Sequence, residues 1–391
     1  MARIFVNAVS MGIGGNRTYL YEVLKNCAEV SQLHEYCVLL PRSGISQSPH
    51  LTSRNVSILP ESYRVPEARW RRALWEQLVL PFVIRRYDVD ALMSVGSVDV
   101  FIASGLMHVP SVVVVQINQP WMVPNLLPSK YRVAYLRAGM SLAKRTARYF
   151  VVVSETAKQE LCQAFDIERE RVSVIYHGGA SEIFSPEAQA RQGMLDHYGI
   201  TKPYILSVSS VFTFKNHHRL VEAYAIVRKR FPNAPRLLIV GAVLHRSYFA
   251  EIEQLVDSLG VRGSVCFLGH VPHDDLPAIY ANAELYVFPS LCETFGLTQL
   301  EAMACGVPVI ASNVSVMPEI CGDAAEYFDP YVPDDIAEAI LKIIVDKKRK
   351  RELVAKGFQR VRAFSWEKTA KQTIELLEEV ARVNVIELSV T

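Results

Sequence analysis

The stretch FPSLCETFGLTQLEAMACGVPVIAS, from Phe288 to Ser312, contains a complete strand–helix–strand unit. An apolar strand ends at Pro289, and a glycine-containing loop follows it. The helical pattern then continues until Gly306, where glycine and a following proline are typical stop signals. A second apolar strand, Val307–Ala311, comes directly afterwards. The stretch therefore predicts two parallel strands joined by a crossover helix.

The same alternation of strands and helices extends in both directions from this unit. The second half runs from a strand at Tyr204–Val208 to a helix at Asp334–Asp346, and the first half begins with a strand at Arg3–Ser10. Two such series, joined within Gly178–Lys202, predict two doubly wound, Rossmann-like α/β domains. Ligands of such sheets bind beyond the carboxyl ends of the strands, so we expect a cleft between the domains.

The composition narrows the class of protein. The chain has 391 residues and a formal net charge of only +2, which argues against a protein that binds nucleic acid in bulk. The apolar start runs straight into glycines and does not resemble a signal peptide, and no apolar run is long enough to span a bilayer. Seven scattered cysteines without a CxxC pair indicate a reducing compartment, so we expect a cytoplasmic protein.

The loop and helix inside the opening stretch carry groups suited to a sugar nucleotide. The N–H groups of Gly296, Leu297 and Thr298 lie at the predicted helix N-terminus, which favours an anion such as a diphosphate. Glu301 lies about one turn into the helix, where its carboxylate can accept bonds from two vicinal hydroxyls, as on a ribose. Glu293 precedes the helix, where sugar hydroxyls would fall.

This stretch closely resembles the E-x7-E region of the retaining GT-B glycosyltransferases of family four, the group 1 glycosyl transferases. That pattern runs roughly E-x-F-G-L-P-x-x-E-A-M-A-x-G-x-P-V-I-A-S. Thr298 stands where proline is usual, and threonine keeps its N–H group. The resemblance places Phe295, Gly296, Leu297, Thr298 and Glu301 at the donor nucleotide. The matching residues are Glu293, Phe295, Gly296, Leu297, Glu301, Ala302, Met303, Gly306, Pro308 and Val309.

The segment SVSSVFTFKN, which ends at Asn216, resembles the first strand and loop of the family's donor domain. Lys215 falls on the diphosphate-binding lysine, whose ammonium can neutralise charge on the leaving group. A surface lysine is disfavoured here, because a cation at a helix start opposes the helix dipole. Ser210 occupies a donor-loop position where the family often has an arginine.

Further positions follow from the same resemblance. The segment VCFLGHVP contains His270 and Val271, which would border the nucleobase mainly through their backbone; His270 is equally explained as a turn residue. Gly14 and Gly15 match a glycine-rich loop that approaches the donor phosphate and the acceptor. Asn118 aligns with a loop in which relatives carry a histidine that contacts the donor sugar, and it can either bond a sugar hydroxyl or build a turn.

Two other patterns have competing explanations. The DVD triplet Asp88–Asp90 has the form of a metal motif from the other large glycosyltransferase fold, but it precedes a strand in a chain without that layout, and we interpret it as chance. The stretch Arg69–Arg86 mixes Trp70 and Trp75 with arginines. It can lie on an anionic bilayer surface, or its aromatic side chains can pack into the first domain.

The resemblance implies a domain layout: an acceptor-binding domain over residues 1–190, a donor-nucleotide domain over 200–365, and a C-terminal helix at 366–391 that packs back on the first domain. It also implies a retaining, metal-independent enzyme. The sugar, which we expect to be mannose or a related deoxyhexose from a GDP-sugar, would move to a hydroxyl of a glycan or lipid-linked glycan at the inner membrane face. Lys215, Glu293 and Asn118 are the expected catalytic residues.

Two alternatives remain open at this point. One is a sugar-nucleotide epimerase on the same fold, and the other is a non-catalytic protein that binds nucleotide sugars. No metal and no cofactor beyond the donor substrate are expected, and no nucleic-acid partner.

Overall fold

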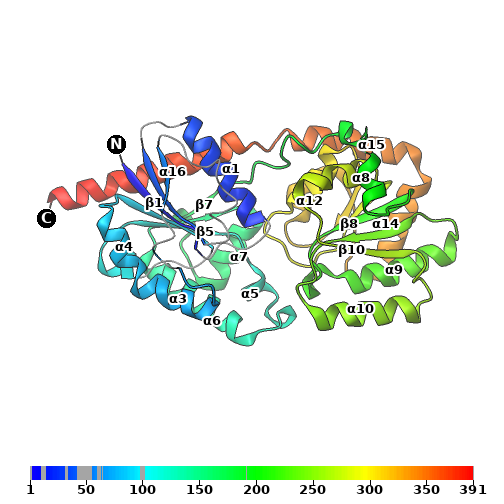
Figure 1. Cartoon of the computed structure of the whole chain (residues 1–391), viewed down its shortest axis with the longest axis horizontal. Coiled ribbons are helices and arrows are strands. Elements are labelled where there is room, and N and C mark those ends of the chain that lie inside the picture. The colour runs from blue at the N-terminus through cyan, green and yellow to red at the C-terminus, as the bar shows by residue number, and fades with distance from the viewer. Residues whose placement is uncertain are drawn as a thin grey trace. The chain divides into compact units, whose positions relative to one another are not determined.

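The computed structural model describes residues 2–9, 15–30, 34–41, 55–59, 63, 65–96, 102–190 and 192–390. The chain divides into two compact units, drawn in Figure 1, and each is built around one parallel sheet. The prediction of two Rossmann-like domains is confirmed. The first unit is Met1–Met122, Ser129–Gly178 and Ser365–Thr391, and the second is Val123–Pro128 and Gly179–Phe364.

The first unit has a sheet with the strand order β3-β2-β1-β4-β5-β6-β7, in which all neighbouring pairs are parallel. Its strands are β1 (Arg3–Asn7), β2 (Glu35–Leu39), β3 (Val56–Ile58), β4 (Ala91–Val95), β5 (Ser111–Val115), β6 (Tyr149–Val152) and β7 (Val172–Val174). Its helices include α1 (Gly15–Val30), α3 (Arg69–Leu78), α4 (Leu80–Arg86), the π-helix η2 (Ile102–Leu106), α5 (Gln119–Met122), α6 (Lys130–Thr146), α7 (Glu155–Phe165) and α16 (Trp366–Val390).

The second unit has a sheet with the strand order β10-β9-β8-β11-β12-β13, again with parallel pairs. Its strands are β8 (Tyr204–Val208), β9 (Arg236–Val240), β10 (Val265–Gly269), β11 (Leu285–Phe288), β12 (Val309–Ser312) and β13 (Ala325–Phe328). Its helices include α8 (Gln192–His197), η6 (Thr213–Lys215), α9 (His217–Arg230), α10 (Arg246–Ser258), α11 (Leu276–Ala281), α12 (Leu297–Ala304), α13 (Met317–Cys321), α14 (Pro333–Val345) and α15 (Lys347–Val361).

This second sheet has the strand order of a dinucleotide-binding fold. Counted from β8, the order is 3-2-1-4-5-6, so the chain changes direction between β8 and β11. These two strands pair directly, with Ile205 beside Leu285 and Leu206 beside Tyr286. In open sheets of this kind, ligands bind at the carboxyl ends of the strands at such a switch point.

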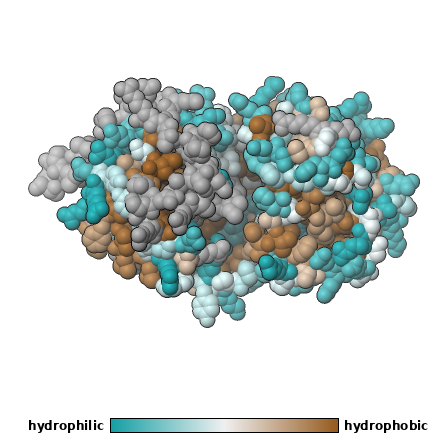
Figure 2. Space-filling model, viewed as in Figure 1, coloured by the Kyte–Doolittle hydropathy of each residue, from teal (hydrophilic) through white to brown (hydrophobic). Residues whose placement is uncertain are grey.

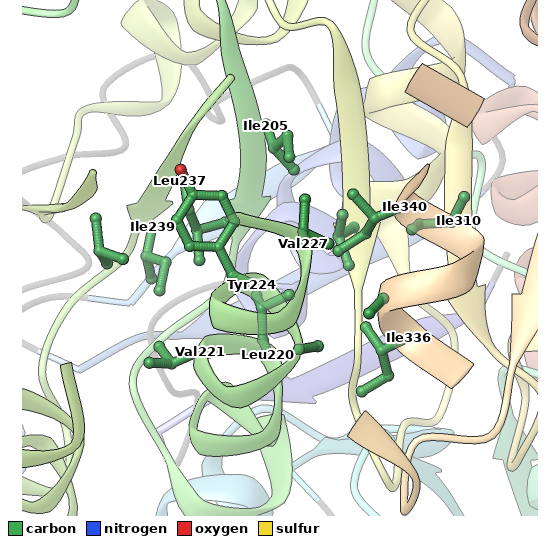
Figure 3. Packing of buried hydrophobic residues seen from close by; sticks show 14 of the residues in the cluster. Ile205, Leu220, Val221, Tyr224, Val227, Leu237, Ile239, Ile310, Ile336 and Ile340 are labelled. Carbon is green, nitrogen blue, oxygen red and sulfur yellow. The ribbon is translucent and has the colours of Figure 1, made fainter. Parts of the chain in front are cut away.

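The core of the second unit holds this switch point rigidly. Figure 3 shows Tyr224 and Val227 of α9 between Leu237 of β9 and Ile340 of α14, all of them buried. The hydroxyl of Tyr224 donates to the carbonyl oxygen of Pro235 at 2.9 Å, so the aromatic ring enters the core without leaving a polar atom unpaired.

The structure differs from the sequence expectation at two elements. The sequence predicts one helical stretch over Ala68–Arg86, but the structure has two helices there, α3 and α4, which meet at Val79. Pro81, in the first turn of α4, lacks the N–H group that a continuous helix would need. The strand β13 was not predicted, because it is a four-residue edge strand with only two buried residues.

The boundary between the units also differs from the expected one at residue 190. Residues 179–190 group with the second unit, where Phe184 packs edge-on against His273 and Tyr280. The helix α16 groups with the first unit. There, Thr369 Oγ1 donates to Tyr176 O at 2.7 Å, and His34 Nε2 lies 2.7 Å from Glu378 Oε1.

Among the described helices, none combines the length and the apolar character that crossing a membrane requires.

Candidate active site

The two loops that follow β8 and β11 meet at the switch point of the second sheet. The loop after β8 leads through η6 to Lys215, and the loop after β11 carries Glu293. The backbone joins them, since Leu291 N donates to Phe214 O at 2.8 Å. Two of the predicted catalytic residues therefore come together at the place where the fold provides a ligand site.

The ammonium of Lys215 contacts the carboxylate of Glu293 directly. Nζ lies 2.5 Å from Oε1, and the two side chains are only 15% and 12% exposed. The same Oε1 accepts a hydrogen bond of 2.6 Å from Ser290 Oγ. A partly buried charge is costly without a partner, and in this arrangement each side chain supplies the partner of the other.

Asn216 holds the two loops in register. It is fully buried and adopts a left-handed backbone conformation, with φ of 62°. Its amide nitrogen donates to Pro289 O at 3.1 Å and to Pro330 O at 2.8 Å. Asparagine tolerates this conformation better than most residues and supplies the two donors. Sequence reasoning missed Asn216 and Ser290, since neither stands out in its local pattern.

His217, the first residue of α9, does not add a second positive charge beside Lys215. It is fully buried, and its Nε2 lies 3.1 Å from Ser209 Oγ. Burial, with smaller contributions from the charges of Lys215 and His218, lowers the pKa of His217 to about 3. The imidazole is therefore neutral at physiological pH.

The helix α12 begins at the carboxyl end of the loop after β11. Gly296 precedes it with φ of +102°, and a Cβ there would lie 2.7 Å from Gln299 Oε1, so the turn requires glycine. Within the described residues, no side chain caps this N-terminus. The predicted anion-binding amides of Leu297 and Thr298 thus stand in the first turn of a real helix.

Glu301 faces the interior one turn further along α12. It is only 8% exposed, and Tyr280 Oη donates to its Oε2 at 3.0 Å. Burial raises the pKa of Glu301 to about 7, and the hydrogen bond from Tyr280 opposes that rise. Tyr280 was not among the predicted site residues, because in the sequence it has the appearance of an ordinary core aromatic.

The predicted nucleobase turn lies at the ends of β9 and β10. His270 is exposed, Val271 is buried, and Gly241 N donates to Gly269 O at 2.8 Å. Gly241 has φ of +151°, and a Cβ there would lie 2.0 Å from Ser209 O. A side chain is therefore excluded where the loop carrying Ser210, which is half-buried, passes closest.

Phe295, also predicted at the donor nucleotide, is buried and packs edge-on against Phe364, with ring centroids 5.5 Å apart. This contact anchors the loop between β11 and α12 to the end of the second unit. The structure assigns Phe295 a packing role, and its place at a nucleotide stays a prediction.

The predicted site residues of the first unit are Asn118, Gly14 and Gly15. Asn118 is 1% exposed. Its side-chain amide nitrogen donates to Glu160 Oε2 at 2.6 Å, and its backbone carbonyl oxygen accepts from Trp121 N and Met122 N. It therefore builds the turn into α5, and its contact with a donor sugar stays a prediction. Gly15 is the first residue of α1, and Gly14 lies outside the described residues.

The DVD triplet has a structural role. Asp90 Oδ2 accepts a hydrogen bond of 2.7 Å from Arg3 N, which ties the segment before β4 to the start of β1. In the described part of the chain, no group of three or more His, Cys, Asp or Glu side chains is arranged to hold a metal ion.

Comparisons with known proteins identify the family and the fold. The model of the "Glycosyl transferases group 1" matches residues 198–360, and that of "Glycosyltransferase Family 4" matches residues 13–179. The structure of Anabaena Alr3699/HepE in complex with UDP and glucose shares the fold, with a TM-score of 0.77 and 21% identity over 97% of this chain and 100% of that one. WaaG, a glycosyltransferase involved in lipopolysaccharide biosynthesis, has a TM-score of 0.73 and 15% identity over 96% of this chain and 99% of its own.

Curated relatives share more sequence with the chain. The O-antigen chain mannosyltransferase B of Escherichia coli is 32% identical over 63% of this chain and 64% of its own length. The serotype-specific mannosyltransferase WbdA of Escherichia coli is 32% identical over 57% of this chain and 28% of its own. The chain thus spans less than two thirds of the length of these relatives. With one family model matched in each half, the chain belongs to the group 1 glycosyl transferases, in glycosyltransferase family 4.

Proposed function

We propose that this protein is a retaining, metal-independent glycosyltransferase. Its donor is a nucleoside-diphosphate sugar, and its acceptor is a hydroxyl of a glycan or lipid-linked glycan. The observation that carries the proposal is the contact between Lys215 and Glu293 at the switch point, beside the N-terminus of α12. A cation, helix-terminal amides and a carboxylate are the groups that a diphosphate and a sugar require.

Each of these groups has a role in the proposal. The ammonium of Lys215 and the amides of Gly296, Leu297 and Thr298 hold the diphosphate, and Glu301 accepts hydrogen bonds from the ribose hydroxyls. Glu293 accepts hydrogen bonds from the transferred sugar. When the donor binds, its diphosphate takes the place of Glu293 beside Lys215, so the contact with Glu293 positions the cation for the diphosphate.

The transfer we propose occurs on one face of the sugar. The bond between the anomeric carbon and the phosphate oxygen breaks, and its electron pair stays on the diphosphate. The acceptor oxygen forms its bond to the same face of that carbon, and its proton moves to the leaving phosphate oxygen. Lys215 acts by stabilising the charge that grows on the diphosphate, which makes the catalysis electrostatic.

The names of the relatives support the choice of sugar. Two Escherichia coli relatives are mannosyltransferases, one of them for an O-antigen chain, which favours mannose or a related deoxyhexose and a polysaccharide acceptor. We therefore propose a GDP-sugar donor. A structural neighbour was solved with UDP-glucose, so a UDP-sugar is the donor to test against it.

The decisive experiment is incubation of the full chain with a panel of GDP- and UDP-sugars, with and without polysaccharide acceptors. Release of nucleoside diphosphate together with a product of retained anomeric configuration is the expected result. An epimerised sugar nucleotide would instead identify an epimerase, and binding without turnover would identify a non-catalytic binding protein.

A further inference from the structure

The first unit exposes its large apolar side chains on one part of its surface. Among its described residues, every large apolar side chain that is strongly exposed lies between residues 70 and 142. These residues belong mainly to α3, α4, η2 and α6, and we call the surface that they form the α3–α6 surface. In Figure 2, hydrophobic colour gathers at the lower left of the molecule, where Figure 1 draws α4. Contact with water alone does not require so many exposed apolar side chains in one region of the surface.

The helix α3 divides its aromatic residues between the core and the solvent. Trp75 packs against the core cluster of the first unit, as one of the two sequence explanations predicted. Trp70 does not: it is 64% exposed, and Leu74 and Leu78 continue its stripe at intervals of four residues. Phe82 in α4 is 69% exposed. Trp70, Leu74 and Leu78 thus form an apolar stripe on the solvent-facing side of α3, where their exposed side chains add little to the packing of the core.

The helix α6 presents a second stripe of the same kind. Tyr131, Tyr135 and Leu142 are spaced by four and seven residues, so they share one helix face, and all three are exposed. The helices α3 and α6 both contact η2. Burial, and to a smaller extent the carboxylate of Glu76 in α3, raise the pKa of Tyr135.

Positive charge predominates around both stripes, with the exposed acidic residues Glu67 and Asp88 flanking α3 and α4. The sequence from residue 100 to residue 154 contains six Lys and Arg residues and not one Asp or Glu, although the whole chain has a net charge of only +2. The acidic residue of α3, Glu76, is buried and accepts a hydrogen bond of 3.2 Å from Asn7 Nδ2. The exposed cations described in α3, α4 and α6 are Arg71, Arg85, Arg86, Lys130, Arg132, Arg137 and Arg145.

We propose that the α3–α6 surface docks the protein on an anionic lipid bilayer. Exposed tryptophan, tyrosine, phenylalanine and leucine beside arginine are the groups that enter the boundary between headgroups and acyl chains. The occupant must carry negative charge, because the apolar stripes lie among cations. A second copy of this chain would bring the same positive charge to the contact, which disfavours self-association.

The test is co-flotation of the full chain with vesicles. One set contains phosphatidylcholine alone, and the other contains about one third phosphatidylglycerol, which supplies the negative surface potential. Each is used at low salt and at 1 M salt, where the Debye length falls to about 3 Å. The variants are Trp70→Ser/Phe82→Ser, which removes apolar area, and Arg71→Glu/Arg85→Glu, which reverses charge.

A matched control is available in the second unit. Lys347 and Lys348 at the start of α15 are exposed, so Lys347→Glu/Lys348→Glu changes the net charge by the same amount at another site. Thermal unfolding of each variant shows whether it has folded. Flotation does not depend on transferase activity, so this inference and the proposed function can fail independently.

The expected result is binding to the anionic vesicles at low salt, loss of binding at 1 M salt, and a decrease in partitioning of at least about tenfold for both surface variants. The control variant should partition within about threefold of the wild type. Absence of binding at low salt, or an equal loss in the control, would overturn the proposal. A dimer that is abolished by Trp70→Ser/Phe82→Ser would also overturn it, since the surface would then be a contact between copies.

Discussion

The hydroxyl of Tyr280 donates a hydrogen bond of 3.0 Å to Glu301 Oε2 inside the second unit. Tyr280 is itself fully buried, and its ring packs against those of Phe184 and Tyr286. Two effects on the carboxyl group therefore compete: burial, which raises its pKa to about 7, and the hydrogen bond, which favours the ionised form. The group we assign to the ribose thus changes protonation near physiological pH.

The first prediction is that nucleotide affinity depends on pH through Glu301. Because the ionised carboxylate accepts hydrogen bonds from hydroxyls best, GDP or UDP affinity should rise as pH increases through about 7. Tyr280→Phe removes the hydrogen bond that favours ionisation, so the midpoint should move to higher pH. Calorimetric titration of GDP or UDP at pH values from 6 to 9, which span the raised pKa of Glu301, measures this midpoint.

Two variants serve as controls for this profile. Glu301→Gln reports the pH dependence that comes from the ligand's own phosphate. Tyr204→Phe removes a buried hydroxyl in the same unit that donates to Ile279 O and not to a carboxylate. If Tyr280→Phe and Tyr204→Phe have the same profile as the wild type, Tyr280 does not set the protonation of Glu301.

The second prediction concerns the stability of the free protein. The folded pKa of Glu301, about 7, lies above its ordinary value of 4.5, so folding takes up a proton between these values. The stability from this group is fully present below pH 4.5 and is lost as pH rises through about 7. Relative to Glu301→Gln, the wild type should therefore have a lower melting temperature at pH 8 than it has at pH 5. A difference that stays constant would show that Glu301 has the same pKa folded and unfolded.

Much of this site was predictable because its parts are contiguous in the sequence. Glu293, Gly296 and Glu301 lie within one loop and the helix that follows it, so their spacing alone places them around a helix N-terminus. Lys215 is predicted from the resemblance of its segment, SVSSVFTFKN, to the first strand and loop of the family's donor domain.

The partners of these residues were not predictable, because tertiary packing supplies them. Tyr280 is 21 residues before Glu301, in a different helix, and its sequence environment only indicates a buried aromatic. The contact between Lys215 and Glu293 joins residues 78 apart. Burial also decides the pKa of Glu301, and no local pattern distinguishes that carboxylate from a solvated one on a helix face.

The third prediction separates the two glutamates. Glu301→Ala should weaken the binding of free nucleoside diphosphate by about 1.5–3 kcal/mol, the value of hydrogen bonds to a charged group. Glu293→Gln keeps an acceptor for Ser290 and removes the charge that competes for Lys215, so diphosphate affinity should not fall. The same variant should impair turnover of the complete sugar nucleotide. Calorimetry with both ligands tests this, and equal losses for both variants on both ligands would contradict the assignment.

The fourth prediction is that transfer does not require a metal ion. In the proposed site, Lys215 and the amides at the start of α12 neutralise the diphosphate. Initial rates should therefore be unchanged after exhaustive treatment with EDTA. Loss of activity that Mn²⁺ or Mg²⁺ restores, with the donor concentration held constant, would show that a cation other than Lys215 holds the diphosphate.

The last prediction concerns Lys215 itself. The neutral His217 beside it and Ser210 in the same loop supply no second positive charge, so Lys215 carries this role among the described residues of that loop. An interaction that strengthens as charge develops lowers the barrier more than it improves binding. Lys215→Ala should therefore reduce kcat by about 10²-fold or more, as does the loss of one preorganised electrostatic donor. Ser210→Arg, which adds a guanidinium to the loop, should raise donor affinity.

Steady-state rates with the best donor of the panel test the role of Lys215. Lys229→Ala, at the exposed end of α9, is the matched control for loss of a lysine and should keep normal kcat. Lys215→Arg keeps the charge with a different shape and should recover part of the rate, because the role is electrostatic. If Lys215→Ala turns over at nearly the wild-type rate while the melting temperature is unchanged, the diphosphate binds elsewhere. The switch point of the second sheet would then not be the active site.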